Sequence, residues 1–185
     1  MTVVFYNVEN LFDLVDEPVK KDEEFTPEGE KKWTKERYSK KLKDLAEVFT
    51  SINENELPEI IGLSEVENKK VLEDLISTGK LAEGSYKIIH YDSPDFRGID
   101  NALVYRKDEF KVLDHLAVGV TFKDKPDYKT RDILYVKGQT KNRERLHIFV
   151  NHWPSRIGGR ERTEPSRIAV ASVLKQKTDS IFNAD

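Results

Sequence analysis

The chain has 185 residues, of which 37% are hydrophobic and 35% charged, and its formal net charge at pH 7 is -3. This length and composition suit one globular domain over residues 1–185 and exclude a disordered tail or a repeat array. The sequence contains no apolar run long enough to span a bilayer, and the absence of cysteine excludes disulfides and thiolate metal sites. Because the net charge is negative, any phosphate-binding surface must come from a local cluster of cations.

The first half of the chain alternates strand and helix patterns. The apolar run at residues 3–6 predicts a strand that ends at Asn7, and the charged segment 16–32 lacks periodicity, so we expect an exposed loop there. From Thr34, apolar residues recur every three or four positions and predict a helix whose buried face comprises Tyr38, Leu42, Leu45, Val48 and Ile52.

A second strand and helix follow. The run EIIGLSEVEN, residues 59–68, predicts a buried strand. Asn68 is a suitable N-cap for a short helix whose expected inward residues are Val71, Leu72, Leu75 and Ile76.

The second half of the chain is rich in strands and ends in a helix. Short runs of β-branched and aromatic residues predict five strands, at residues 86–91, 101–106, 111–118, 132–138 and 145–152. A final helical pattern has its expected inward residues at Ile168, Ala171, Leu174, Thr178 and Ile181. With no linker or repeat in between, the order of elements indicates an α/β sandwich with sheets inside and helices outside.

Polar residues stand where several predicted strands begin or end: Asn7, Glu65, Arg131, Asn151 and His152. Taken singly, each has an ordinary explanation as a turn former, a solvated charge or a hydrogen-bonded histidine. Taken together, they suit phosphodiester hydrolysis. Glu65 would hold a hard cation such as Mg²⁺, and the amides, imidazole and guanidinium would surround the phosphate.

Five segments in this order resemble the endonuclease/exonuclease/phosphatase superfamily, which includes deoxyribonuclease I-like nucleases, abasic-site endonucleases, inositol polyphosphate phosphatases and sphingomyelinases. The segments are FYNVENLFD, IIGLSEVEN, RGIDNALVYR, TRDILYVKG and VNHWPSRIGG, and the resemblance runs from residue 3 to about residue 160. It implies a four-layer α/β/β/α sandwich of two mainly antiparallel sheets flanked by helices.

The resemblance also implies roles for individual residues. Asn7 would be the active-site asparagine beside the metal, Glu65 the metal-binding glutamate and Glu9 a second acidic residue near the metal. His152 would contact the scissile phosphate and protonate the leaving oxygen, and Arg131 would contact a phosphate. The implied cofactor is Mg²⁺, with Mn²⁺ as an alternative.

After His152 the chain enters a basic loop. We expect Asn151 to face the phosphate with His152, and the residues Ser155, Arg156, Gly158, Gly159, Arg160 and Arg162 to form a flexible cationic rim. Arg156 is the best candidate for substrate binding in this set. In the alternative, Arg160 and Arg162 are solvated and offset by Glu161 and Glu164.

Two further features favour structural roles. We expect Arg97 and Asp100 to serve in a salt bridge or turn, and Trp33 and Trp153 to pack in the core or a loop, although either tryptophan could stack on a base.

The family's later motifs, a Gly-Asp-Phe/Leu-Asn stretch and an Asp-His pair, do not occur in the chain. We therefore expect the 185 residues to be the N-terminal portion, about two-thirds, of a longer catalytic domain, and to have little activity alone. The abrupt start at a strand, without a signal peptide, suggests that a leader has been trimmed. Localisation and oligomeric state stay open.

The predicted function is a metal-dependent phosphodiester hydrolase, with nucleic acid as the first choice of substrate. A phosphomonoesterase or a lipid-headgroup phosphodiesterase of the same superfamily, and a non-catalytic phosphate-binding module, are the alternatives.

Overall fold

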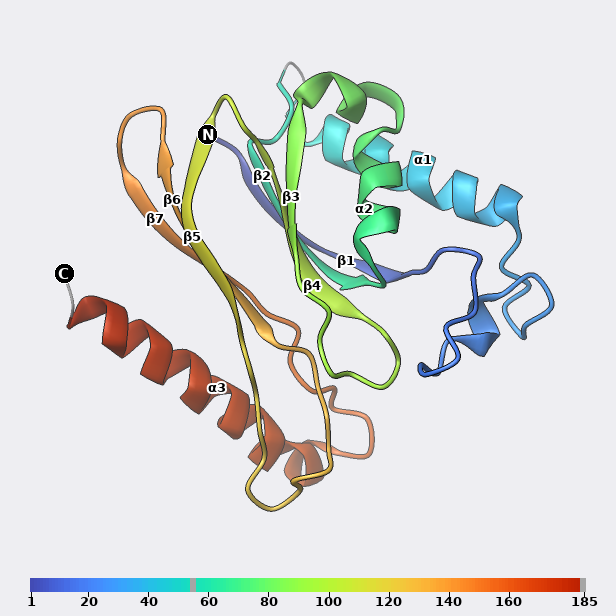
Figure 1. The fold of residues 1–185 in the computed structure, drawn as a ribbon, viewed down its shortest axis with the longest axis vertical. Coiled ribbons are helices and arrows are strands. Elements are labelled where there is room, and N and C mark those ends of the chain that lie inside the picture. Colours follow the sequence, from blue (N-terminus) through green and yellow to red (C-terminus); the bar gives the residue numbers. More distant parts are fainter. Residues whose placement is uncertain (54–55, 184–185) are drawn as a thin grey trace.

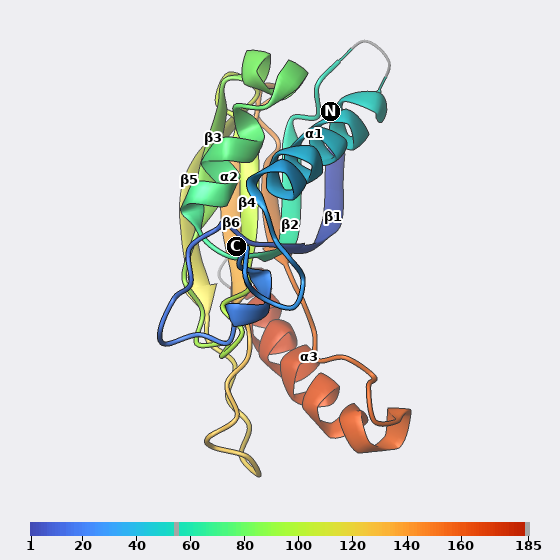
Figure 2. The same ribbon diagram turned by 90° about the vertical axis from the view of Figure 1, so that its right-hand side faces the viewer.

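Two β-sheets face each other between helices in the computed structural model, which describes residues 1–53 and 56–183 (Figure 1). The first sheet has the strand order β1-β2-β4-β3, from Val3–Leu11, Ile60–Val66, Asp100–Arg106 and Tyr86–His90. The second has the order β5-β6-β7, from Phe110–Val118, Ile133–Thr140 and Arg145–Val150. Helices α1 (Lys35–Ser51) and α2 (Lys69–Ile76) cover the outer face of the first sheet, and α3 (Arg160–Phe182) lies against the second (Figures 1 and 2).

The strand pairing confirms the predicted class of fold. β1 and β2 pair in parallel, whereas β2–β4, β3–β4, β5–β6 and β6–β7 are antiparallel. Two short 3-10 helices, η1 (Glu23–Phe25) and η2 (Gly79–Gly84), complete the elements. None of the helices in the described part of the chain has the length and apolar character needed to cross a membrane.

Helix α1 begins as predicted, because the Thr34 side chain accepts a hydrogen bond from the backbone N–H of Arg37. Its buried face differs in part from the prediction. Val48 and Ile52 are exposed, and the inward residues are Tyr38, Leu42, Leu45, Ala46 and Phe49. The buried stripe of α1 therefore continues from Leu45 to Phe49, four residues further along the helix. The Phe49 ring packs there against Tyr6 of β1.

The two sheets are joined by a second core. It contains Ile60, Ile89, Leu103, Phe110, Leu134, Val136 and Val150. Gly62 lies at the contact between β2 and β7, where a Cβ atom would stand 3.2 Å from Cγ2 of Val150. The close approach at Gly62 brings the end of β7 to the end of β2, which places their last residues together.

The segment 16–32 is not a fully exposed loop, contrary to the prediction. Asp22 is buried, and Phe25 stacks on Phe12 with 4.3 Å between ring centroids. The indole N–H of Trp33 donates to the backbone oxygen of Phe12 at 2.9 Å. These aromatic contacts attach a charged segment to the core, so the predicted structural role of Trp33 is confirmed.

Helix α3 also differs from the prediction, because it begins at Arg160 rather than near Ile168 and contains Pro165. Arg160 and Arg162 are therefore helical and do not belong to a flexible rim. The face packed on the second sheet contains Ala169, Val170, Val173 and Leu174, whereas Ile168 is 59% exposed. The apolar residues of α3 are spread around the helix, so the sequence pattern did not define which face is buried. In the structure the face that contains Val170 packs on the second sheet.

Candidate active site

The C-terminal ends of β1, β2 and β7 meet the loops before β4 and β6 at one end of the two sheets (Figure 1). A cavity of about 640 Å³ opens there. Its lining includes Glu65, Arg97, Arg131 and His152, which come from four segments far apart in the sequence. The fold thus brings two of the predicted catalytic residues and the predicted phosphate-binding arginine to one cavity.

Glu65 reaches this cavity because of an irregularity in β2. Leu63 and Val66 both belong to the core under the helices, although residues of a regular strand share a face only at even spacing. The register shifts between Ser64 and Val66, and Glu65 has the left-handed backbone angle φ 65. A β-bulge therefore turns Glu65 out of the core face, and a conformation of this kind costs about 1–3 kcal/mol.

The adjacent strand β1 has a matching irregularity. Val8 and Leu11 both face the helices, and the residues between them, Glu9 and Asn10, have φ 54 and φ 62. The Oδ1 atom of Asn7 accepts the backbone N–H of Glu9 at 2.8 Å, which fixes the amide group. Its Nδ2 atom then donates to Oε1 of Glu65 at 2.9 Å.

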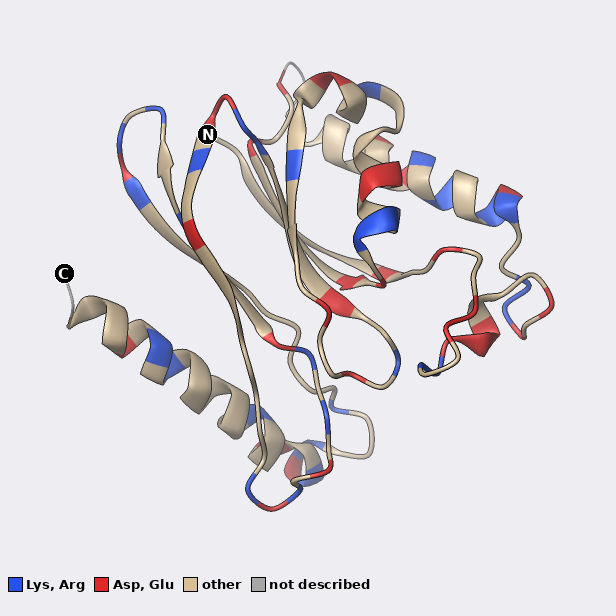
Figure 3. Ribbon diagram, viewed as in Figure 1, with Lys and Arg blue, Asp and Glu red and all other residues tan. Residues whose placement is uncertain are grey.

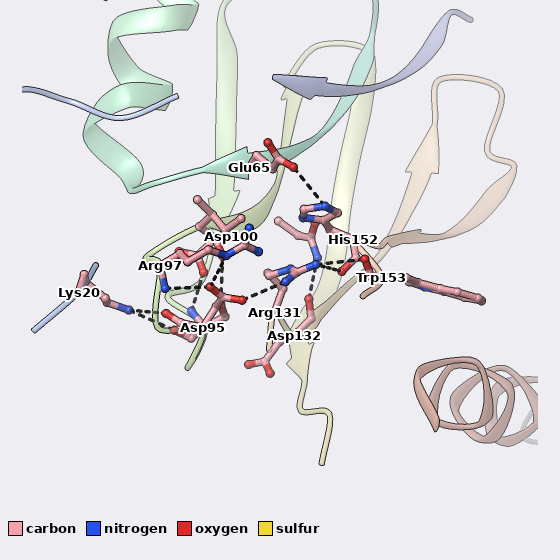
Figure 4. A network of polar contacts seen from close by, with 12 residues as sticks. Lys20, Glu65, Asp95, Arg97, Asp100, Arg131, Asp132, His152 and Trp153 are labelled. Atoms are coloured by element: carbon pink, nitrogen blue, oxygen red, sulfur yellow. Dashed lines mark hydrogen bonds and ion pairs between the residues drawn. The ribbon is translucent and has the colours of Figure 1, made fainter. Parts of the chain in front are cut away.

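His152 faces the same carboxylate oxygen from the other sheet. Its Nε2 atom lies 3.3 Å from Oε1 of Glu65, whose side chain is 15% exposed (Figure 4). Burial and, to a lesser degree, the charge of Arg131 lower the pKa of His152 to about 4 although Glu65 opposes them, so the ring is neutral at pH 7. The contact with Glu65 is a close approach of the ring to the carboxylate, and the Nδ1 atom of His152 is buried without a hydrogen-bond partner in the described structure.

Arg131 connects the loop before β4 to the end of β7. Its Nη1 atom donates to Oδ2 of Asp95 at 3.0 Å, and Nη2 donates to the backbone oxygens of His152 and Trp153 at 3.0 and 3.1 Å (Figure 4). The Arg131 side chain is only 4% exposed. It therefore holds His152 in place, while its predicted contact with a phosphate stays a prediction.

Arg97 is the more open cation of the cavity. Its Nε atom lies 3.3 Å from Oδ1 of Asp95, so it forms a salt bridge, with Asp95 rather than Asp100 as the partner, and its side chain is partly exposed. Asp100 is buried, accepts the N–H of Ser93 at 2.8 Å and faces Nε2 of His90 at 3.0 Å, which confirms its expected structural role.

Among the described residues, no side-chain hydrogen bond or ion pair joins three predicted site residues to the Glu65–His152 pair. The amide of Asn151 donates to the backbone oxygen of Phe149 and accepts the indole N–H of Trp153. Glu9 is exposed at the β1 bulge, and Arg156 lines a separate hollow beside α3. Their roles in catalysis, metal binding and substrate binding stay predictions.

Lys41 is a residue of this region that sequence reasoning missed. Its Nζ atom donates to the backbone oxygen of Glu9 at 2.7 Å, so α1 supports the β1 bulge. Burial lowers the pKa of Lys41, while Glu9 and Glu65 raise it. Lys41 lies in α1 among several other lysines, so no local pattern distinguished it from its solvated neighbours.

Several buried polar atoms without hydrogen-bond partners lie at the same end of the sandwich. Among the described residues they include the side-chain atoms Ser64 Oγ, Asn101 Oδ1, Thr130 Oγ1 and Arg131 Nε. Groups of this kind suit a site that receives a polar ligand. Oε2 of Glu65 also accepts no hydrogen bond from residues 1–53 or 56–183, and a hard oxygen of this type suits a divalent cation.

A second group of possible cation ligands lies beside the loop before β4. The side chains of His90, Asp92 and Asp100 each offer one ligand atom, and these atoms lie within 4.8 Å of one another. This group was not predicted from the sequence. Because His90 and Asp100 already pair at 3.0 Å, the group also has a structural explanation.

Solved structures with the same fold come from bacteria and vertebrates. An endonuclease/exonuclease/phosphatase family protein from Bacteroides thetaiotaomicron aligns with TM-score 0.63 and 16% identity over 98% of this chain and 59% of its own. TDP2 of D. rerio, humanized by 14 mutations, aligns with TM-score 0.57 and 14% identity over 94% of this chain and 54% of its own. The human Nocturnin catalytic domain aligns with TM-score 0.53 and 22% identity over 68% of this chain and 47% of its own.

The chain thus spans about half the length of these structures. No curated protein matches it in sequence. The sequence profile of the Endonuclease/Exonuclease/phosphatase family, however, matches residues 2–185. Together with the two facing sheets and the polar cavity between their ends, this match identifies the chain as a member of the endonuclease/exonuclease/phosphatase family.

Proposed function

We propose that the chain carries the metal-binding and phosphate-binding part of a phosphodiester hydrolase that uses Mg²⁺, or alternatively Mn²⁺, and acts on nucleic acid. The observation that supports this most is the arrangement around Glu65. One oxygen of its carboxylate is shared by Asn7 and His152, at 2.9 and 3.3 Å, and the other has no hydrogen bond within the described residues.

The donor set fits a hard divalent cation. Glu65 supplies a carboxylate oxygen and Asn7 orients it, while Glu9 on the adjacent bulge offers a second carboxylate. A bound Mg²⁺ would neutralise charge that develops on the phosphate oxygens. The two bulges hold these groups before any ligand arrives, which lowers the reorganisation needed for binding.

The remaining residues would act on the phosphate. His152 is neutral at pH 7 and can donate a hydrogen bond from a ring nitrogen to a phosphate oxygen. Arg97 adds a partly exposed positive charge at the cavity, and Arg131 keeps His152 in position through its backbone oxygen. These three residues would supply hydrogen bonds and positive charge around the phosphate.

The experiment that tests this proposal combines metal binding with hydrolysis. The protein is titrated calorimetrically with Mg²⁺ and with Mn²⁺, and its hydrolysis of bis-p-nitrophenyl phosphate and of plasmid DNA is measured with each metal. We expect metal-dependent hydrolysis, and we expect Glu65→Gln to abolish metal binding and to lower turnover at least about 100-fold.

The matched control is Glu73→Gln, because Glu73 is an exposed residue of α2 that pairs with Lys69. This variant should keep the affinity and turnover of the unaltered protein. A folded protein that binds neither metal, or that hydrolyses neither substrate in their presence, would overturn the proposal and favour a phosphomonoesterase, a lipid-headgroup hydrolase or a binding module.

A further inference from the structure

A hollow of about 290 Å³ lies between the loop after β7 and the outer surface of α3, next to the candidate active site. Its lining combines one aromatic ring, an exposed aliphatic side chain and several charges: Trp153, Arg156, Arg160, Glu164, Arg167 and Ile168. We call this hollow the Trp153 pocket. None of these residues lines the cavity that contains Glu65 and His152.

The position of the Trp153 pocket is fixed relative to the active site. Trp153 follows His152 directly, and one nitrogen of Arg131 binds the backbone oxygens of both residues. The Trp153 side chain extends away from the Glu65–His152 pair toward a helix (Figure 4). It is 36% exposed, with its indole N–H held by Asn151 at 3.2 Å, so the ring is oriented and still accessible.

The charges of the Trp153 pocket favour an anion. The guanidinium groups of Arg156 and Arg160 make no hydrogen bond or ion pair within the part of the chain that the structure describes. Arg167 bonds along its own helix, to the Thr163 hydroxyl and the Arg160 backbone oxygen. Figure 3 shows Lys and Arg around the start of α3, interspersed with Asp and Glu, and Glu164 is the acidic member of the pocket lining.

We infer that the Trp153 pocket binds a nucleotide that flanks the scissile phosphate in single-stranded nucleic acid, with its base on Trp153 and its phosphates near Arg156 and Arg160. This inference rests on the proposed function for the position of the scissile phosphate. An exposed ring beside unpaired arginines is the combination that single-stranded nucleic acid recognises, because every unpaired base offers a face for stacking. A base inside a duplex is already stacked and cannot lie on Trp153.

Intrinsic fluorescence can test the inference without any hydrolysis. The chain has two tryptophans, and Trp33 is buried at 7% exposure, so it provides an internal reference. Octathymidylate is titrated into the protein in EDTA. We expect it to quench tryptophan emission, and we expect Trp153→Phe to remove most of this quenching while Trp33 still emits.

Affinity measurements by fluorescence anisotropy separate stacking from charge. Trp153→Ala should weaken octathymidylate binding roughly tenfold, and an abasic strand of the same length should lose a similar factor with the unaltered protein. Arg156→Ala and Arg160→Ala should each reduce the dependence of log affinity on log salt by about 0.7. Arg145→Ala is the matched control, because Arg145 is an exposed arginine at the opposite end of β7 and should leave both quantities unchanged.

The outcomes distinguish this inference from the proposed function. Metal-dependent hydrolysis of bis-p-nitrophenyl phosphate without quenching by octathymidylate would overturn the Trp153 pocket and leave the hydrolase in place. Quenching that depends on Trp153 in a protein without metal binding would support the pocket and overturn the hydrolase. Equal affinity for octathymidylate and for a duplex of the same length would contradict stacking on Trp153.

Discussion

The Nε2 atom of His152 lies 3.3 Å from the Oε1 atom of Glu65, although Glu65 belongs to the first sheet and His152 follows a strand of the second. Glu65 stands on a bulge of β2, and His152 follows the last residues of β7. The distance between them therefore depends on how closely the sheets pack, and Gly62 allows that approach beside Val150. The core between the sheets thus determines the geometry of the candidate active site.

Removal of the His152 ring should lower turnover and have a smaller effect on metal binding. In His152→Ala, we expect the hydrolysis of bis-p-nitrophenyl phosphate to fall about 100-fold or more, because a positioned hydrogen-bond donor to the phosphate is lost. His115→Ala is the control, since His115 is an exposed residue of β5 in the second sheet, and its Nδ1 atom pairs with the hydroxyl of Tyr91. Full turnover in His152→Ala would exclude the proposed hydrogen bond from His152 to the phosphate.

Lys41 should stabilise the β1 bulge and thereby the metal site. Lys41→Met removes the hydrogen bond to the Glu9 oxygen, and we expect the free energy of unfolding to fall by about 1–2 kcal/mol and the metal affinity to weaken. Lys40→Met is a matched control on the same helix, because exposed Lys40 pairs only with Asp44 and should contribute about 0.3–0.5 kcal/mol. Urea unfolding and calorimetry measure the two effects, and equal losses in both variants would contradict a special role for Lys41.

The buried pair of Arg131 and Asp95 should be far more important for stability than the partly exposed pair of Arg97 and Asp95. Arg131→Met leaves the Asp95 carboxylate in a buried place with less compensation, so we expect a loss of about 3–5 kcal/mol in urea unfolding. Arg97→Met removes a solvated partner of the same carboxylate and should cost about 0–1 kcal/mol. A reversed order of the two variants would show that Arg97 carries the ion pair.

The polar ends of the strands were predictable, because strands of a sandwich deliver their ends to common edges. Asn7, Glu65 and His152 were singled out because each follows an apolar run, and the resemblance to the superfamily implied a common site; the structure brings all three together. Helix α1 was also predictable, since Thr34 caps it and Tyr38, Leu42 and Leu45 form a regular stripe. In these cases short-range pattern and tertiary packing favour the same outcome.

Other features depend on contacts between distant segments and could not be read from a local pattern. The left-handed backbone at Glu65 is unusual for a glutamate, and only the register against β1 and β4 requires it. The resemblance implied that Arg131 contacts a phosphate. In the structure its guanidinium donates to Asp95, which lies 36 residues earlier in the chain. The start of α3 was missed because Gly158, Gly159 and Pro165 are typical of a loop.

A buried carboxyl close to the candidate site should make the stability of the protein depend on pH. Glu67 accepts the backbone N–H of Asp13 at 2.6 Å, and burial raises its pKa to about 8, with Asp13, Asp22 and Glu17 contributing in the same direction. The backbone hydrogen bond opposes this rise. In the unfolded chain the same carboxyl titrates near its ordinary value of about 4.3.

The sign of the effect follows from these two pKa values. Below about pH 4.3 both states carry the proton and the contribution of Glu67 is fully present. As the pH rises toward about 8, the unfolded chain ionises while the folded protein keeps its proton, so the free energy of unfolding falls. Glu67→Gln keeps the acceptor for Asp13 and removes the ionisation, so it should be more stable than the unaltered protein at pH 8, by about 4–5 kcal/mol, and about equally stable at pH 4.

Urea unfolding in EDTA across this pH range measures the difference, and the metal-free condition keeps Glu65 out of the comparison. Glu73→Gln serves as the control, because its exposed carboxyl should leave the pH dependence of stability almost unchanged. The decisive quantity is the slope of the unfolding free energy between about pH 5 and pH 8. The same slope in Glu67→Gln and in the unaltered protein would show that Glu67 is already ionised in the fold.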